Sequence, residues 1–397
     1  MAELRQNTWT LDQWYDQDVA GNVSYTGTKE FWVAGRGNNG QLGNNTTALY
    51  SSPVQIPGTT WNAEFYNAIT GSHVVHAKTD GTLWSWGKNT DWGQLGHNTR
   101  ANNISSPVQI GSGTDWKLGG TTREGSFAIK TDGTLWTWGD CRSGSGGWNI
   151  GGNPAVRSSP TQVGSDTTWD KAFGGDYHMF GIKTDGTLWS WGYNANGRLA
   201  LNTPGVPGSR VSSPTQVGSG SDWDHVSITG GYGNGAIKTD GTLWMWGFNN
   251  NGIIGVNDRT ARSSPTQVPG TTWKTYSSGG ENMLAVKTDG TLWAWGSNGK
   301  GVLGQNQSPS DGPDGLSSPT QIGSDTDWDK ISSCAYGQAA IKTDGTLWTW
   351  GRSDSGVSAQ NTGPGQDRSS PVQVPGTDWF AVGHTSSSQT LMLFKEL

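Results

Sequence analysis

Charged residues are scarce in this chain of 397 residues, at 15% of the total. The sequence also lacks the features that mark membrane-spanning, secreted and nucleic-acid-binding proteins. There is no run of eighteen apolar residues, so the sequence predicts no transmembrane helix. The N-terminus has no basic region followed by an apolar one, so we expect no signal peptide. The net charge of -6 argues against bulk nucleic-acid binding, which relies on clustered Lys and Arg.

Cysteine is nearly absent as well. The two cysteines, Cys141 and Cys334, lie far apart in the chain, so we expect both to stay reduced and structural. The six histidines include no pair with zinc-like spacing, and no Gly-x-Ser-x-Gly or Gly-x-x-x-x-Gly-Lys-Ser/Thr motif occurs. The sequence therefore predicts no metal, cofactor or catalytic residue, and a hydrolase or lyase stays open only for a site assembled from distant segments.

Glycine (62) and tryptophan (24) are abundant, and both recur in one phrase, Lys-Thr-Asp-Gly-Thr-Leu-Trp-x-Trp-Gly. A fixed period of 49 to 55 residues indicates one supersecondary unit used repeatedly, which favours a binding scaffold over an enzyme. A Ser-Ser-Pro triplet and a lone Trp also occur seven times each, so the chain holds seven units. The phrase ends at Gly87, Gly139, Gly192, Gly247, Gly296 and Gly351, with a degenerate copy at Gly35; the lone tryptophans are Trp61, Trp116, Trp169, Trp223, Trp273, Trp328 and Trp379.

Residues 158–192 show how one unit is expected to fold, as a four-stranded antiparallel meander that begins with the Ser-Ser-Pro strand. Asp185 and Gly186 form a two-residue connection, for which we expect a type I′ turn with positive φ at both positions. This turn chemistry explains the six Asp-Gly aspartates without calcium, because their spacing matches no EF-hand loop. The expected strands are 160–163, 169–173, 179–184 and 188–191.

Seven small sheets with periodic aromatic and glycine residues predict an all-β fold, a seven-bladed β-propeller of four-stranded antiparallel blades. The last unit supplies three strands and no fourth, whereas the first supplies only a fourth strand, at 29–34. We therefore expect the N-terminal and C-terminal strands to pair and close the ring, with the propeller domain covering residues 28–397.

The wording of the repeat resembles a known family. Leu-Trp-Ser-Trp-Gly, ending at Gly87, is followed by Gly-Gln-Leu-Gly, ending at Gly96, and this combination resembles the regulator-of-chromosome-condensation propeller repeats over about residues 28–397. The resemblance implies a seven-bladed propeller. It does not imply the nucleotide exchange on a small GTPase that eukaryotic members perform, because the surface elements for that activity are not matched. The regular Lys-Thr-Asp-Gly-Thr-Leu-Trp wording is similar to bacterial and bacteriophage versions.

Residues 1–27 stand outside the repeat as an N-terminal extension. Trp9, Leu11, Trp14 and Tyr15 make this segment too apolar for a free tail. It either docks on the rim of the propeller or anchors the protein to an assembly, such as an oligomer or a virion. Its opening is similar to the starts of propeller proteins in marine phage genomes.

The meander assigns every loop to one end of the ring. We call the loop that runs from each Trp-x-Trp-Gly glycine to the next Ser-Ser-Pro a crossing loop. The crossing loops and the loops that follow the lone-Trp strands lie at the same end of the ring, which we call the crossing face. The crossing loops hold ten of the twelve arginines and carry twelve basic against seven acidic side chains, a balance of +5 on a chain of -6. The sequence therefore predicts a basic crossing face and an acidic opposite face. For Arg157, Arg262 and Arg368, beside Ser-Ser-Pro, local pairing is the alternative.

Aromatic residues outside the repeat positions point to the same face. Trp92 and Trp148 lie in crossing loops of adjacent units, and Tyr193 and Phe248 follow the Trp-Gly of the next two. Flat rings beside arginines suit sugar rings or a protein hot spot, although each ring could instead fold back over its own loop. The candidate ligand-binding residues are Trp92, Trp148, Tyr193, Phe248, Arg142, Arg198, Tyr177 and Tyr232.

We therefore expect a non-catalytic recognition propeller. The sequence favours a phage-type virion protein, such as a tail fibre or receptor-binding component, which contacts a surface glycan or protein through the crossing face. The alternative is an intracellular or secreted scaffold or inhibitor that binds a protein. Neither interpretation calls for nucleic acid, membrane insertion or a cofactor, and both are compatible with an oligomer.

Overall fold

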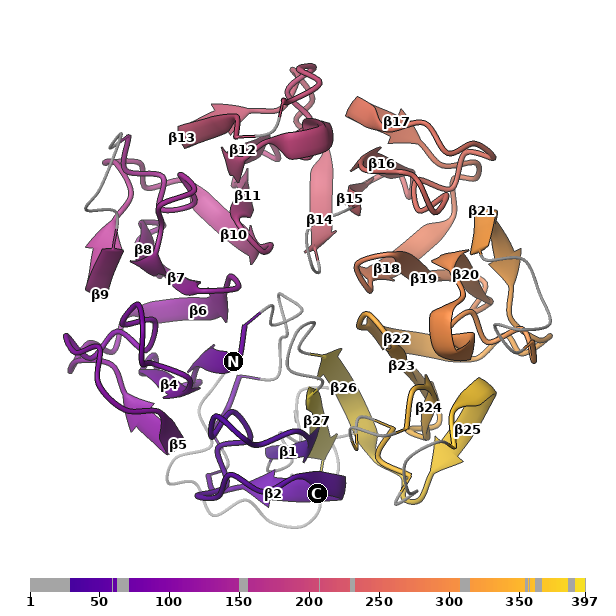
Figure 1. Ribbon diagram of the computed structural model, residues 1–397, viewed down its shortest axis with the longest axis horizontal. Coiled ribbons are helices and arrows are strands. Elements are labelled where there is room, and N and C mark those ends of the chain that lie inside the picture. The colour runs from indigo at the N-terminus through magenta and orange to yellow at the C-terminus, as the bar shows by residue number, and fades with distance from the viewer. Residues whose placement is uncertain are drawn as a thin grey trace, which may run out of the picture.

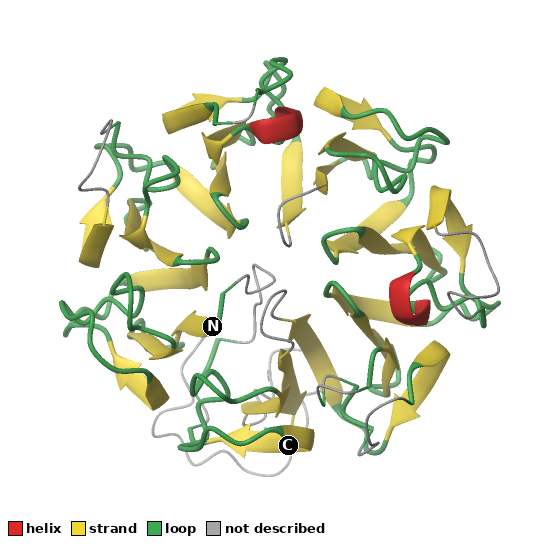
Figure 2. Ribbon diagram, in the orientation of Figure 1, coloured by secondary structure: helices red, strands yellow, loops and turns green. Residues whose placement is uncertain are grey.

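Seven small antiparallel sheets, the blades, stand around a central axis (Figure 1). This computed structural model describes residues 29–58, 60–62, 71–149, 156–206, 208–228, 233–307, 315–353, 356, 358–360, 366–384 and 390–396. In this part of the chain, two short 3₁₀ turns, η1 (Ala195–Gly197) and η2 (Gly299–Gly301), are the only helical elements (Figure 2). The prediction of a seven-bladed propeller is confirmed.

Each blade begins at the strand with the lone Trp, nearest the axis, and ends at a Ser-Ser-Pro strand on the outside. Blade 1 contains β3 (His73–Ala77), β4 (Leu83–Gly87) and β5 (Ile104–Gln109), and blade 2 contains β6 (Trp116–Thr121), β7 (Gly125–Lys130), β8 (Leu135–Asp140) and β9 (Val156–Gln162). Blade 3 contains β10 (Trp169–Gly174), β11 (His178–Lys183), β12 (Leu188–Tyr193) and β13 (Arg210–Gln216). Blade 4 contains β14 (Trp223–Ile228), β15 (Gly233–Lys238), β16 (Leu243–Gly247) and β17 (Arg262–Gln267).

The remaining blades repeat this order. Blade 5 contains β18 (Trp273–Ser278), β19 (Asn282–Lys287), β20 (Leu292–Ser297) and β21 (Gly315–Gln321), and blade 6 contains β22 (Trp328–Ser333), β23 (Gly337–Lys342), β24 (Leu347–Gly351) and β25 (Arg368–Val374). Blade 7 contains β26 (Trp379–His384), β27 (Thr390–Glu396), β1 (Lys29–Gly35) and β2 (Tyr50–Ile56). In blade 1 the inner position is marked by Trp61, which bridges Lys78.

The predicted unit boundary was wrong by one strand. In blade 3 the Ser-Ser-Pro strand that pairs with β12 is β13, so Trp189 lies opposite Gln216. The preceding Ser-Ser-Pro strand, β9, pairs with β8 in blade 2 instead of with β10. A meander of antiparallel strands has the same sequence pattern wherever it is cut, so the pattern could not show which turn joins two blades. The assignment of loops to the two faces is unaffected, because alternate turns still fall at opposite ends.

The closure of the ring is confirmed. Strand β1 pairs with β27 along its whole length, from Lys29 opposite Glu396 to Gly35 opposite Thr390. The N-terminal part contributes two strands to this blade, β1 and β2, because the Ser-Ser-Pro strand β25 belongs to blade 6. The indigo and yellow strands of Figure 1 lie side by side in the closing blade.

Hydrogen bonds explain the Asp-Gly-Thr-x-Trp wording. The Asp185 carboxylate accepts from the backbone N–H and the hydroxyl of Thr187, at 3.0 and 2.7 Å, and that hydroxyl accepts from the indole N–H of Trp189 at 2.9 Å. Only Gly186 has positive φ, at 77°, and its N–H donates to the Lys183 carbonyl. The expected type I′ turn is therefore wrong, and the loop is a longer one with glycine in the left-handed region.

Adjacent blades are joined by tryptophan and asparagine. The indole N–H of Trp191 in blade 3 donates to the carbonyl of Ser145 in the crossing loop of blade 2, at 2.9 Å. In that loop Asn149 adopts a φ of 53° and its N–H donates to the carbonyl of Ser212 in β13. The same pair of contacts recurs around the ring.

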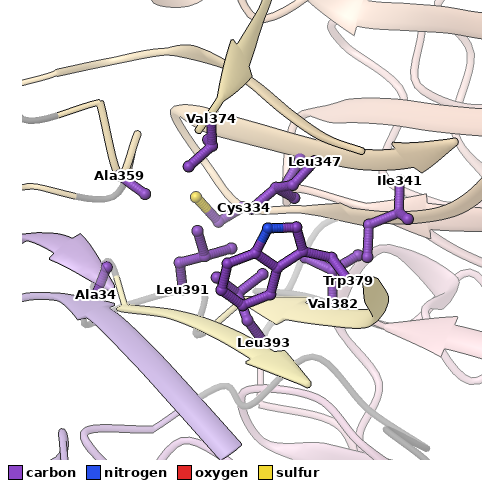
Figure 3. Packing of buried hydrophobic residues seen from close by; sticks show 11 residues of the cluster. Ala34, Cys334, Ile341, Leu347, Ala359, Val374, Trp379, Val382, Leu391 and Leu393 are labelled. Atoms are coloured by element: carbon purple, nitrogen blue, oxygen red, sulfur yellow. The ribbon is translucent and has the colours of Figure 1, made fainter. Parts of the chain in front are cut away.

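The core lies between the blades (Figure 3). One cluster packs Trp379, Leu391 and Leu393 of blade 7 against Ile341 and other residues of blade 6. Cys334 belongs to this cluster, and both cysteines are buried and free; burial raises the pKa of the Cys334 thiol to about 11.

Among the described residues, no helix is long and apolar enough to cross a membrane.

Candidate binding site on the crossing face

Arg142 and Trp92 bring two blades together on the crossing face. Trp92 lies in the crossing loop of blade 1 and Arg142 in that of blade 2, and the guanidinium carbon of Arg142 lies 3.9 Å from the centre of the Trp92 ring. Asp140, at the end of β8, accepts from Nε and Nη2 of Arg142 at 2.9 and 2.8 Å and fixes the plane of the guanidinium. The hydrogen bonds to Asp140 raise the pKa of Arg142, so this side chain is a permanent cation.

A second arginine stack joins blades 2 and 3. Arg123, in the loop between β6 and β7, lies 5.5 Å from the centre of the Tyr177 ring, and its Nη1 lies 3.7 Å from the carboxylate of Asp176. Burial raises the pKa of Asp176 to about 6, against the opposing effect of Arg123 and Arg198. The sequence interpretation included Tyr177 and missed Arg123, because it searched the crossing loops for arginine. Arg123 lies in the other loop of the same face.

A third stack, Arg198 on Tyr193, is more deeply placed. The guanidinium carbon of Arg198 lies 5.0 Å from the centre of the Tyr193 ring, but only 7% of the residue is exposed. Its Nε donates to the Ala195 carbonyl at 3.0 Å, and its own carbonyl accepts from the indole of Trp246 in the next blade. Arg198 therefore stabilises the seam between blades 3 and 4 and leaves little of its charge for a ligand.

Further polar contacts connect the first two stacks. Nζ of Lys88 in blade 1 lies 2.9 Å from the Asp91 carboxylate and 3.8 Å from the Glu124 carboxylate in blade 2. Burial raises the pKa of Glu124. Arg210 of blade 3 donates from Nη1 to the backbone carbonyl of Arg142 at 2.9 Å. The loops of blades 1, 2 and 3 thus form one network, which we name the blade 1–3 network.

The charges at the two arginine stacks of the blade 1–3 network are layered, whereas Asp91, which pairs with Lys88, is 48% exposed. The side chains of Asp140, Asp176 and Glu124 are 11%, 19% and 24% exposed, whereas those of Arg142 and Arg123 are 46% and 47% exposed. A partner that approaches this face therefore meets guanidinium groups lying on aromatic rings, with the carboxylates that orient them beneath.

Trp148 and Phe248, two of the other candidate residues, are not part of the contacts that define this network. Trp148 packs against the core between blades 2 and 3, with Arg157 above it at 5.4 Å, so it is chiefly a packing residue. Phe248 is half-buried in blade 4. Tyr232 lies outside the described residues. Arg157 also bonds the neighbouring Val156 carbonyl, and Arg262 pairs with Asp258 at 2.5 Å, so local pairing holds for these two.

Sequence reasoning also missed a set of ion pairs on the inner strands. Lysine and aspartate that follow the lone tryptophans pair between neighbouring blades; the signal was the alternation of Lys and Asp directly after Trp. The pairs are Lys117–Asp170 at 2.6 Å, Lys171–Asp224 at 3.0 Å and Lys274–Asp329 at 2.5 Å.

The described part of the chain contains no group of three or more His, Cys, Asp or Glu side chains able to hold a metal ion. The Asp-Gly aspartates each accept two hydrogen bonds from the threonine two residues later, as in the Asp185 turn, and these bonds lower their pKa. His73 and His178 are fully buried, and burial lowers the pKa of each to about 3. These two histidines therefore act as neutral hydrogen-bonding groups of the blade seams.

The repeat, the Trp-mediated seams and the closing blade define a class of protein, the regulator-of-chromosome-condensation type of β-propeller. The chain matches the model of the RCC1-like domain over residues 30–393, and it belongs to this family.

The comparisons with individual proteins agree. The chain is similar to the ultraviolet-B receptor UVR8 of Arabidopsis thaliana, with 29% identity over 247 residues that cover 60% of this chain and 53% of that protein. The mitochondrial RCC1 domain-containing protein RUG3 of the same plant is 28% identical over 259 residues, 60% of this chain and 54% of that one. The chain thus spans about half the length of these relatives.

Solved structures share the fold. Prp20p from Saccharomyces cerevisiae superimposes with a TM-score of 0.78 at 18% identity, covering 94% of this chain and 92% of that one. Human WBSCR16 gives a TM-score of 0.76 at 19% identity, covering 93% and 99%. All these proteins are eukaryotic, so the expected bacterial or bacteriophage version finds no support among them.

Proposed function

We propose that this propeller is a non-catalytic binding protein, a scaffold or inhibitor, and that a protein partner docks on the blade 1–3 network. The observation that carries the proposal is the Arg142–Trp92 stack, which a carboxylate holds in place and which leaves nearly half of the arginine exposed. Arginine, tryptophan and tyrosine are the residue types that dominate binding energy at protein interfaces.

The family supports a protein as the partner. The solved structure of Prp20p is described together with its binding to Gsp1p and histones, and a second structure shows Kap60 bound to yeast RCC1. These partners belong to the yeast protein. For the present chain they indicate only that a propeller of this architecture serves as a platform for other proteins.

The preference for a phage tail fibre or receptor-binding component now rests on the sequence features alone. The half-buried rings of Trp92 and Tyr177 would also suit a sugar. Glycan binding by such a component is therefore the second candidate function, and a virion location would follow from it alone. The eukaryotic relatives and the guanidinium layer favour the protein-binding alternative over it.

The test compares the protein with a Trp92→Ala/Arg142→Ala double variant and with Arg262→Ala, a control that removes a locally paired arginine of blade 4 from the same face. Proteins that co-purify with the wild type and Arg262→Ala, but not with the double variant, are then purified and their affinity is measured by calorimetry. We expect at least a tenfold loss for the double variant. Equal affinity of all three proteins would refute the site, and binding to a glycan array that the double variant loses would support the second candidate.

A further inference from the structure

Six blades contain the same aromatic cage around a lysine, at the end of the ring opposite the crossing face. In blade 6 the ammonium of Lys342 lies 4.8 Å from the ring centre of Trp328 and 5.1 Å from that of Trp348. The two indoles meet edge to face, with centres 6.0 Å apart and planes at 75°. Across the six blades the lysine–ring distances are 3.8 to 5.1 Å. An ammonium in this position is attracted by both π faces.

Carboxylates complete four of the six cages, those of blades 2, 3, 4 and 6. The residue before the lone tryptophan is Asp222 in blade 4 and Asp327 in blade 6, and these carboxylates lie 3.2 and 3.1 Å from Nζ of the caged lysines. In these blades the cage is therefore two indoles and an acid, a combination that suits a lysine ammonium in charge and shape. The indole N–H of the outer tryptophan is occupied by a threonine hydroxyl, as in Trp348 to Thr346 at 3.0 Å.

Blade 7 has the two rings of this cage in the same arrangement, and an aspartate at the same position of the sequence. Trp32 and Trp379 meet edge to face with centres 6.2 Å apart and planes at 82°. Asp378 precedes Trp379, as Asp327 precedes Trp328, and its side chain is exposed at the surface. In place of threonine, the carboxylate of Glu30 accepts from the indole N–H of Trp32 at 3.0 Å, which brings a second negative charge to this cage.

What differs in blade 7 is the cation. Lys395 lies opposite Trp379 in the strand register, as Lys342 lies opposite Trp328. Within the part of the chain that the structure describes, however, the cation–π contact of blade 7 is that of Lys29 with Phe380, at 5.3 Å, and no lysine or arginine lies over Trp32 or Trp379 or pairs with Asp378. Lys395 lies opposite Glu30 where β27 pairs with β1. No Asp-Gly turn connects these two strands, because they come from opposite ends of the propeller domain.

We propose that the blade 7 cage binds the side-chain ammonium of a lysine, primary or N-methylated, from a partner protein. The six filled cages show that this geometry accepts a lysine. The half-buried ring of Trp32 and the carboxylates of Asp378 and Glu30 supply the groups that attract a cation in blade 7, and the two negative charges offset its loss of hydration. The site lies at the opposite end of the ring from the blade 1–3 network and does not depend on the function proposed above.

The test uses the full chain with ¹⁵N-labelled tryptophan and follows the indole N–H resonances by NMR. The probes are tetramethylammonium chloride, Nα-acetyl-lysine amide, whose side-chain ammonium is free, and the same compound trimethylated at Nε. Sodium chloride is the ionic control. We expect saturable shifts of the Trp32 and Trp379 resonances, with affinities on the order of millimolar for the free ions. Trp32→Phe assigns the Trp32 resonance, and Trp32→Ala should abolish the shift of Trp379.

Lys342→Ala provides a matched positive control, because it opens the blade 6 cage without touching blade 7. The variant should gain a second responding pair, Trp328 and Trp348. Absence of shifts at Trp32 and Trp379 in the wild type overturns the proposal, whether or not the blade 6 cage responds. A response that appears only in Lys395→Ala also overturns it, because that result would show Lys395 to be the occupant in solution.

Discussion

The guanidinium of Arg142 lies over the ring of Trp92, 3.9 Å from its centre, although the two residues belong to different blades, and Asp140 of the arginine's own blade holds it there. A stack of this kind depends on the spacing between blades as well as on the two side chains. The rigid inter-blade packing thus extends into the loops of the crossing face, where a partner meets preorganised groups and less side-chain entropy is lost on binding.

Removing Arg142 should affect binding far more than folding. Arg142→Ala should reduce the free energy of unfolding by no more than about 1 kcal/mol, because the Arg142 side chain is 46% exposed. Arg142→Lys keeps the charge but loses the planar stack and the two bonds to Asp140, so its affinity for a partner should lie between those of Arg142→Ala and the wild type. Urea denaturation and calorimetry measure the two effects. A loss of more than about 3 kcal/mol in stability would show that Arg142 has a structural role.

Deleting residues 392–397 should unfold the whole ring. This deletion removes most of β27, including Met392, Leu393 and Phe394, which are fully buried, and it separates β1 and β2 from β26. Truncation of one buried phenylalanine alone costs about 3–5 kcal/mol, a large part of the stability of a typical domain. Circular dichroism melting checks this, with Lys395→Ala as a control that should melt like the wild type. An unchanged melting curve for the deletion would disprove closure.

Acid should destabilise the protein through its buried histidines. Burial lowers the pKa of His73, His178 and His384 to about 3, from 6.5 in the unfolded chain. Below pH 6.5 the unfolded chain therefore binds protons that the folded protein does not, so stability is fully present above that pH and is lost progressively as the pH falls towards 3. The slope is up to about 1.4 kcal/mol per pH unit for each histidine. Urea denaturation at several pH values should show a shallower slope for His178→Gln, and equal slopes would contradict this assignment.

Asp176 should have the opposite effect. Burial raises the pKa of its carboxyl from 3.8 to about 6, so the folded protein binds this proton more tightly than the unfolded chain does. Its ionisation therefore reduces stability as the pH rises through this interval, by up to ~3 kcal/mol. Asp176→Asn should be more stable than the wild type at pH 8, and the difference should shrink at pH 5. A variant less stable at pH 8 would show that the contact with Arg123 outweighs the cost of burying the charge.

The sequence predicted the ring well because repetition multiplies a weak signal. Seven copies of the lone Trp and of Ser-Ser-Pro gave the blade number, and the unpaired strand at 29–34 gave the closure. The blade boundary was wrong because strand pairing along a meander leaves no mark in the sequence. The turn type was wrong because Asp-Gly fits several turns, and the choice depends on the Thr187 contacts.

The candidate site was predicted only in part. Arg142 and Trp92 meet because the crossing loops of adjacent blades lie side by side, which the repeat implies. Trp148 was expected at the surface and is instead packed between blades 2 and 3, since a loop sequence does not reveal which way its aromatic side chain folds. Arg123 was missed because it lies outside the crossing loops, to which the count of arginines was confined, and its partners, Asp176 and Tyr177, belong to another blade.

The pairing of β1 with β27 shows that the arrangement of the blades does not depend on the order in which the chain connects them. These strands pair as fully as strands joined by a turn, so the covalent order of the blades is not what holds the ring together. Any short connection between two blades, such as residues 217–222 between β13 and β14, could serve as the chain ends if a Thr-Asp-Gly turn joined Glu396 to Lys29. A circular permutant made in this way would have the same seven blades and the same interfaces, and it would place the ends of the chain at a different blade.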